Sequence, residues 1–445
     1  PPVEFEEVMM PEGAGKHPYV KEEPTGKLNY WGYTKGGVFA PKASYSSGKE
    51  KHPVKEFKEL VKALHKAGLE IIVELYFTGE ESPVFALDAV RSWVERYHVD
   101  GVHLVGNAPL KLIGEDPFLS RTKLIALSWD GVDGGRVRHL GEYNDGFLED
   151  GRRLLKGDEG QINQLVFRLK RNPAKCAAIN YIASTNGFTL MDMVSYDRKH
   201  NEDNGENCRD GTDSNYSWNC GVEGPTRKKK VLEMRKKQIR NALILVFLSQ
   251  GTPLLLAGDE FGNSQSGNNN AYCQDNEISW TNWHLDKGRK ELLAFVSKLI
   301  HLRLDHPVLH RRRFFTGREP GDDSNTIPQV EWFDHTGSIM DMDDWQNTHA
   351  FSMMIYLNGS DIPEVDWYGN RMVDNDFILI FNAHYEPIMF TLPDERYGRK
   401  WQLVVDTHNP NEPALSYEAG FMITAQSRSF LMLMSAKKPK KPMGL

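Results

Sequence analysis

The chain has 445 residues, of which 40% are hydrophobic and 26% are charged, as is ordinary for a folded globular protein. Its 54 basic and 61 acidic residues give a formal net charge of −7, so we expect it to bind neither nucleic acid nor a membrane. The longest apolar runs, such as Ala242–Leu248, are too short to span a bilayer. The four cysteines show no C-x-x-C spacing and predict buried or idle thiols, with a redox-sensing pair as the alternative.

Helices and buried strands alternate along the first two thirds of the chain. Apolar residues repeat at helical spacing over 54–67, Gly68 ends this helix, and Leu69–Leu75 follows as an apolar strand. This alternation predicts an α/β fold, either a parallel (β/α) barrel or a doubly wound sheet. No G-x-G-x-x-G turn opens a helix, which disfavours a dinucleotide-binding sheet. Further strands are predicted at Val102–Val105, Thr122–Ala126, Ala177–Ala183 and Leu254–Ala257, and further helices at Ala86–Tyr97, Val231–Leu248 and Lys287–Asp305.

The pattern changes after Arg313, where short strands follow one another without helices between them. Turn residues separate these strands, which is typical of a small antiparallel β domain. The basic residues of the helix Val231–Leu248 are interpreted as a solvated face, with an acidic partner surface as the alternative. The predicted strands are Met353–Leu357, Phe377–Phe381, Ile388–Leu392, Gln402–Asp406 and Ser429–Met434.

Several stretches carry a family resemblance. They are Asn29–Tyr33, Val194–Tyr196, Ser217–Thr226, Ser249–Pro253, Ala257–Phe261 and Gly267–Asn276. On these stretches the chain resembles the isoamylase-type glycogen and starch debranching enzymes of the α-amylase superfamily. It is most similar to the non-catalytic second isoamylase isoform of plants and green algae.

The resemblance implies a (β/α)8 barrel followed by an antiparallel β-sandwich. On this basis we expect the barrel over residues 1–317, N-terminally incomplete because its first strand is missing. A connecting segment over 318–350, the sandwich over 351–435 and a basic tail over 436–445 complete the expected organisation.

The resemblance also indicates where the catalytic acids of active members fall in this chain. A retaining glycosidase needs two carboxyl groups about 5 Å apart. Here the nucleophile position is Val105, the general acid position is Leu127, and the position of the transition-state-stabilising Asp is Asn186. The Arg beside the nucleophile is replaced by His103, and the first motif reads Glu74–Gly79 without the sugar-binding Asn and His. A valine cannot form a glycosyl ester and a leucine has no proton to give.

These replacements predict that the chain is not an enzyme by itself and has no catalytic residue at the family positions. The resemblance implies a subunit joined to a catalytic isoamylase in a hetero-oligomer that debranches α-1,6 linkages during amylopectin synthesis in the plastid stroma. The chain would contribute glucan binding or stability to that complex. Two alternatives stay open: a free-standing glucan-binding pseudoenzyme, and an active hydrolase that uses displaced acids such as Glu74.

Aromatic side chains in or beside the motif loops are candidates for binding a branched α-glucan, because aromatic rings stack on sugar rings. The alternative is that these rings pack the loops. We expect no cofactor and no metal, since the histidines and cysteines lack metal-ligand spacing, and we interpret the Asp259-Glu260 pair as structural. The candidate glucan-binding residues are Trp31, Phe77, Trp129, Phe188 and Tyr272.

Overall fold

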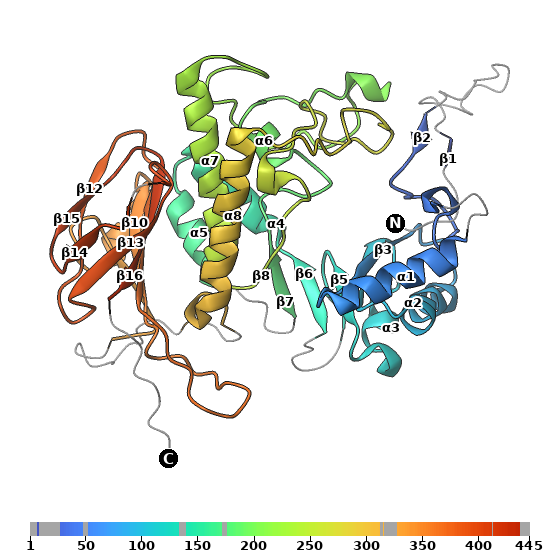
Figure 1. Cartoon of the computed structure of the whole chain (residues 1–445), viewed down its shortest axis with the longest axis horizontal. Helices are drawn as coiled ribbons and strands as arrows, with labels where there is room; N and C mark the ends of the chain where they lie inside the picture. The colour runs from blue at the N-terminus through green and yellow to red at the C-terminus, as the bar shows by residue number, and fades with distance from the viewer. Residues whose placement is uncertain are drawn as a thin grey trace.

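The structure is a computed structural model that describes residues 7–8, 27–47, 52–132, 139–170, 176–311, 315, 327–411 and 413–436. Within these residues the chain forms a six-stranded parallel sheet and a six-stranded antiparallel sheet, with helices between and around them (Figure 1). No helix of the described part is long and apolar enough to cross a membrane. The predicted tail from residue 437 onward lies outside the described residues.

The parallel sheet follows the chain in strand order, from β3 to β8. The predicted strands near β3, β4, β5 and β7 are confirmed, whereas β6 was not predicted. The prediction of a strand at Leu254–Ala257 is wrong, because the strand lies two residues earlier and a turn follows it. The bounds are β3 Ile72–Phe77, β4 Gly101–Gly106, β5 Lys123–Ala126, β6 Leu140–Tyr143, β7 Ala177–Asn180 and β8 Thr252–Pro253.

Local sequence signals set the ends of several helices. The Ser82 side chain accepts a hydrogen bond from Phe85 N at 3.2 Å and Pro83 follows it, a favourable start for α2. Asp286 caps α8 in the same way, with 2.9 Å to Arg289 N. The helices are α1 Pro53–Lys66, α2 Pro83–Tyr97, α3 Leu110–Gly114, α4 Asp145–Lys156, α5 Gln161–Lys170, α6 Leu190–Met193, α7 Lys229–Leu248, α8 Lys287–Asp305 and α9 Met342–Gln346.

The antiparallel sheet has the strand order β14-β13-β16-β11-β10-β9, and β12 pairs with β15 beside it. Strand β9 lies inside the segment 318–350 that we expected to be a connection, and it is hydrogen-bonded to β10. Two short strands near the N-terminus, β1 Glu7–Val8 and β2 Leu28–Asn29, pair with each other. The bounds are β9 Val330–Phe333, β10 Ser352–Leu357, β11 Phe377–Asn382, β12 Ile388–Thr391, β13 Lys400–Asp406, β14 Ser416–Glu418, β15 Met422–Ala425 and β16 Ser429–Ser435.

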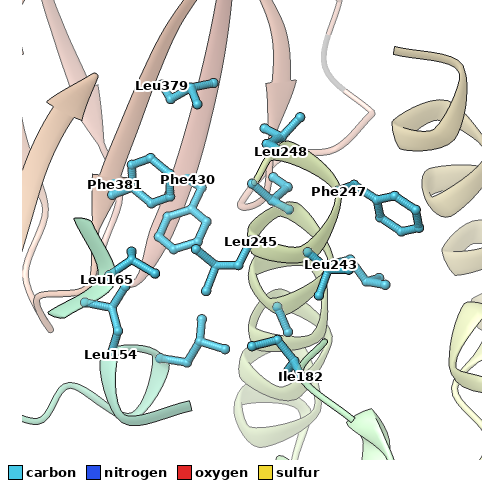
Figure 2. Close-up of a cluster of buried hydrophobic side chains, with 14 of the residues drawn as sticks. Leu154, Leu165, Ile182, Leu243, Leu245, Phe247, Leu248, Leu379, Phe381 and Phe430 are labelled. Carbon is cyan, nitrogen blue, oxygen red and sulfur yellow. The ribbon is translucent and has the colours of Figure 1, made fainter. Parts of the chain in front are cut away.

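Helix α7 joins the two halves of the molecule. Its second half, Ala242–Leu248, is buried on all sides, as expected for a helix without a polar face. Figure 2 shows Leu245 facing Phe430 and Phe381 of the antiparallel sheet, while Phe247 points away toward other helices. One continuous apolar cluster therefore includes residues from both halves.

The basic residues of α7 are not simply the solvated face that we expected. Arg235 and Lys237 are buried. The Lys237 ammonium donates to the carbonyl of Ser427, and Arg240 Nε donates to Thr407 O at 2.7 Å. A buried cation needs such acceptors because its loss of hydration is otherwise uncompensated. These contacts attach α7 to the loops of the antiparallel sheet.

The four cysteines carry free thiols in the structure. Burial is the main cause that raises the pKa of the Cys176 thiol to about 12 and that of Cys220 to about 12. Both thiols are therefore protonated at neutral pH and are weak nucleophiles.

The role of α7 gives a stability prediction. Leu245→Ala should lower the free energy of unfolding by about 2–5 kcal/mol, because it removes a fully buried side chain and leaves a cavity. Urea denaturation followed by circular dichroism measures the change. Leu304→Ala is the matched control, since Leu304 is 69% exposed on α8 and its loss should cost less than about 0.5 kcal/mol. Equal costs for the two variants would contradict the proposed role of α7.

Candidate functional site

A cluster of polar and aromatic side chains lies at the carboxyl ends of the parallel strands. In the register of β3 and β4, Glu74 is opposite His103 and Tyr76 is opposite Val105. Side chains two residues apart in a strand share a face, so these four point to the same side of the sheet. Gly106 ends β4 with φ 77°, and a side chain here would collide with the carbonyl of Phe77. The chain therefore turns sharply at this edge, beside the cluster.

Glu74 is the centre of this cluster. Its two carboxylate oxygens each have a partner: Tyr33 Oη donates to Oε1 at 2.6 Å, and His103 Nδ1 lies 2.6 Å from Oε2. Burial raises the pKa of the Glu74 carboxyl, but the hydrogen bonds from His103 and Tyr33 outweigh it and hold the pKa below its ordinary value. Because an ionised carboxylate only accepts hydrogen bonds, His103 must carry its proton on Nδ1.

Tyrosines continue the cluster across the next strands. The His103 ring stacks on Tyr143 of β6, with centroids 4.8 Å apart and planes 23° apart. Tyr143 meets Tyr181 edge to face at 5.2 Å, and the Tyr181 hydroxyl hydrogen-bonds to the carboxylate of Asp145. Burial, then Glu74 and Asp145, raise the pKa of Tyr143 to about 12. Tyr143 thus lies within the electrostatic reach of two carboxylates, one on each side of the cluster.

The three family positions follow or end strands of the same sheet and carry no charge. Val105 is half-buried at the end of β4, Leu127 is exposed immediately after β5, and Asn186 is exposed beyond β7. The acidic side chains of this edge are instead Glu74 and Asp145.

Three of the five predicted glucan-binding aromatics are core residues. Phe77 is 1% exposed, Trp129 5% and Phe188 0%, so no ring face is available to a sugar. Trp129 also donates from Nε1 to Gly141 O at 2.7 Å, which fixes it under the sheet edge. These three rings lie in the buried apolar clusters, which favours the alternative that we gave, in which the rings are packing residues of the motif loops.

Trp31 and Tyr272 lie together at the surface of the site. Both are half-buried, and their rings meet edge to face at 6.5 Å. The Trp31 ring also contacts the Tyr33 ring, with centroids 5.9 Å apart, and Tyr33 in turn hydrogen-bonds to the Glu74 carboxylate. A glucan-binding role for Trp31 and Tyr272 stays a prediction.

Asp259 and the acidic loop 201–217 make contacts that hold the fold together. Asp259 is buried and accepts from Leu190 N at 2.9 Å, and burial raises the pKa of its carboxyl. The loop 201–217 is fixed by buried amides, since Asn201 donates to Asn269 Oδ1 at 2.9 Å and Asn269 donates to Asn215 Oδ1 at 2.9 Å. Across the described part of the chain, no group of three or more His, Cys, Asp or Glu side chains is arranged to hold a metal ion.

Sequence reasoning found Glu74 but not its partners. The pairing with His103 was accessible, because both occupy the same inward positions of adjacent strands. Tyr143 and Asp145 were missed because β6 contains a glycine and a glutamate and gives no apolar run. Tyr33 comes from a segment 41 residues away, with no periodic signal to place it.

Comparisons with known proteins now identify the family. The chain is 35% identical to a glycogen operon protein GlgX homolog of Mycobacterium bovis, over 92% of this chain and 67% of that protein. It is 32% identical to a glycogen debranching enzyme of Serratia proteamaculans, over 85% of this chain and 63% of that one. It is 31% identical to isoamylase 3, chloroplastic, of Oryza sativa subsp. japonica, over 86% and 56%. Residues 329–422 match the family model described as isoamylase, C-terminal.

Solved structures show the same fold. Pullulanase from Bacillus acidopullulyticus superimposes with a TM-score of 0.63 at 17% identity, over 92% of this chain and 52% of that chain. Pullulanase type I from Bacillus subtilis gives 0.63 at 18% identity, over 92% and 60%. The predicted (β/α)8 barrel with a C-terminal β domain is therefore confirmed. The chain spans about half to two thirds of the length of these proteins.

One prediction is contradicted by these relatives. We expected that the chain is not an enzyme by itself, but the proteins it matches are named as debranching enzymes and pullulanases, which points to an enzyme. The replaced acids at Val105, Leu127 and Asn186 led to that error, because they were judged from the family positions alone. The chain belongs to the isoamylase and GlgX type of glycogen debranching enzymes in the α-amylase superfamily.

Proposed function

We propose that this chain hydrolyses α-1,6 branch linkages of a glycogen- or starch-type α-glucan at the carboxyl edge of its parallel sheet. The observation that carries the proposal is the Glu74 carboxylate, hydrogen-bonded by Tyr33 and His103 at that edge. Barrel enzymes keep their catalytic groups at the carboxyl ends of the strands. The debranching relatives supply the class of substrate.

Glu74 is suited to the charge that forms during glycoside hydrolysis. The transition state resembles an oxocarbenium ion, so an ionised carboxylate beside the sugar stabilises it. The lowered pKa of Glu74 keeps it ionised at neutral pH. Glu74 also fixes the His103 ring through Nδ1, and the stack on Tyr143 fixes its plane. A ring held in this way directs its other nitrogen, Nε2, as an acid or base.

Asp145 is the second carboxylate of the proposal. Hydrolysis of a glycosidic bond uses two carboxyl groups on either side of the linkage. Asp145 lies beyond Tyr143 and is hydrogen-bonded to the Tyr181 hydroxyl, so a sugar seated over the tyrosines would be flanked by Glu74 and Asp145. In the proposed step His103 Nε2 gives a proton to the glycosidic oxygen as the C–O bond breaks, and a water molecule attacks the anomeric carbon and gives its proton to Asp145. In this proposal Val105, Leu127 and Asn186 shape the edge and carry no proton.

The proposal extends to a partner and a location. We infer that the chain works on amylopectin or its precursor together with a catalytic isoamylase subunit in the plastid stroma. The chloroplastic isoamylase among its relatives supports this extension. The bacterial relatives are equally compatible with glycogen as the substrate.

The first prediction concerns Glu74. Glu74→Gln should lower the release of reducing ends from branched glucan by about 10²–10⁴-fold, because the amide cannot carry the negative charge. Glu70→Gln is the matched control: Glu70 precedes β3 at the opposite edge and pairs with Lys123 in solvent. Circular dichroism confirms that both variants fold. Unchanged turnover in Glu74→Gln would refute the assignment, as would equal losses in both variants.

The second prediction concerns pH. A carboxyl whose pKa is lowered on folding stabilises the folded state above its ordinary pKa of 4.5, and this contribution is lost as pH falls through the lowered value. The difference in free energy of unfolding between the wild type and Glu74→Gln should therefore be larger at about pH 6 than at about pH 3. Urea titrations at both pH values measure it. A difference that grows toward acid would show that the Glu74 pKa is raised instead.

The third prediction concerns the partner. The chain and a catalytic isoamylase expressed together should elute as one species in size-exclusion chromatography with light scattering, with a native mass above that of either alone. A co-expressed unrelated barrel enzyme is the control. Two separate peaks at micromolar concentration would remove the partner from the proposal and leave the action on branched glucan untouched.

A further inference from the structure

A hairpin loop between β10 and β11 presents two aromatic side chains to solvent. Trp367 is 96% exposed and Tyr368 is 87% exposed. This loop extends away from the antiparallel sheet in Figure 1, where it is drawn in orange. A tryptophan usually buries most of its large apolar surface, so a fully exposed one is unusual and informative.

The hairpin is held in one shape by its own hydrogen bonds. Val365 and Arg371 form an antiparallel bridge, and Asp366 N donates to Asn370 O at 2.9 Å. The Asp366 carboxylate accepts from Tyr368 N at 2.9 Å and from Asn370 N at 2.8 Å. Gly369 has φ 83°, a backbone conformation that glycine adopts without strain. The two aromatic residues therefore sit on a preorganised turn.

The surroundings favour a small polar ligand over a protein. Val365 is the apolar neighbour on the hairpin, at 59% exposure, and the flanking side chains of Asp361 and Arg371 are charged and exposed. A stable protein interface takes about 20–30 residues on each partner, more than the hairpin 364–372 supplies by itself. One or two sugar rings need only an aromatic face and nearby hydrogen-bonding groups.

We propose that the hairpin 364–372 is a second α-glucan-binding site, separate from the Glu74 edge. The choice of ligand rests on the proposed function, because the branched glucan comes from there. The C–H faces of glucose rings stack on Trp367 and Tyr368, and the exposed ion pair of Asp361 and Arg371, 3.7 Å apart, offers hydrogen-bonding groups to the hydroxyls. Trp and Tyr lose little side-chain entropy on binding, since each has two rotatable side-chain torsions.

A second protein site that binds the same polymer would assist the site at the sheet edge. A glucan chain held at the hairpin converts later encounters with the sheet edge into an intramolecular event, at a high effective concentration. This effect applies to a large polymer that can reach both places. It does not apply to a short oligosaccharide.

Affinity electrophoresis in native gels containing glycogen tests the inference. The probe is glycogen at graded concentrations, and the readout is the apparent dissociation constant from the retardation of the band. The double variant Trp367→Ala/Tyr368→Ala should bind about tenfold more weakly than wild type, for the loss of two stacking contacts. Tyr385→Ala is the matched control, because Tyr385 is an aromatic residue 69% exposed on another loop of the same domain, and it should bind as wild type does.

The comparison is repeated in chains that also carry Glu74→Gln, so that a failure of hydrolysis does not alter the result. A tenfold loss in both backgrounds supports the second site even if the chain shows no turnover. A wild type that glycogen does not retard overturns the inference, and so does a double variant retarded as strongly as wild type. If the double variant changes native mass but not glycogen affinity, the hairpin binds protein and the inference is also overturned.

Discussion

The enclosure of helix α7 is the constraint on which the rest of the structure depends. Its second half has no polar face, and each buried leucine contributes about 1.5–3 kcal/mol only while it is covered. The antiparallel sheet covers one side, through Leu245 and Phe430, and the barrel elements cover the other. Removing either layer would expose apolar surface, so the barrel and the C-terminal domain form one cooperative core in the described residues.

That core also positions the last parallel strands. Arg303 of α8 donates to the carbonyls of Phe247 and Ser249 at 2.7 and 2.8 Å, which fixes the turn after α7. Asn180, at the end of β7, donates to Ser249 Oγ at 3.1 Å. These contacts hold the turn that leads into β8 against the end of β7. Glu74 lies on β3, at the other side of the sheet, and is held by its own hydrogen bonds with His103 of β4 and with Tyr33.

The site shows that the carboxyl edge of the sheet carries carboxylates although the three family positions are uncharged. The family positions Val105, Leu127 and Asn186 are uncharged, yet the same edge holds the carboxylates of Glu74 and Asp145, the His103 ring and the rings of Tyr33, Tyr76, Tyr143 and Tyr181. Side chains from several strands of a barrel converge at its carboxyl end, so the charge there depends on all of these strands together. Comparing motif positions one by one leaves out a carboxylate such as Glu74, which lies on β3 beside the β4 position of Val105.

Much of the fold was predictable because its elements are regular. Lys287–Asp305 was predicted with the bounds that α8 has, since its apolar spacing and the Asp286 cap both mark it. Strand β6 was not predictable, because four residues that include Gly141 and Glu142 carry no apolar pattern. The buried Lys237 was misread as solvated, since a sequence does not reveal the distant carbonyl of Ser427 that receives it. The Glu74 site depends on the same kind of long-range contact, from Tyr33.

The central claim is that branched α-glucan is bound and cleaved beside Glu74. A crystal structure of the Glu74→Gln chain soaked with a branched malto-oligosaccharide tests it most directly. The account predicts a glucose ring at the carboxyl edge, with the glycosidic oxygen within hydrogen-bond distance of residue 74 or His103 and a ring face over Tyr143. A sugar bound elsewhere on the barrel with this edge empty, at a ligand concentration that saturates binding in solution, would contradict it.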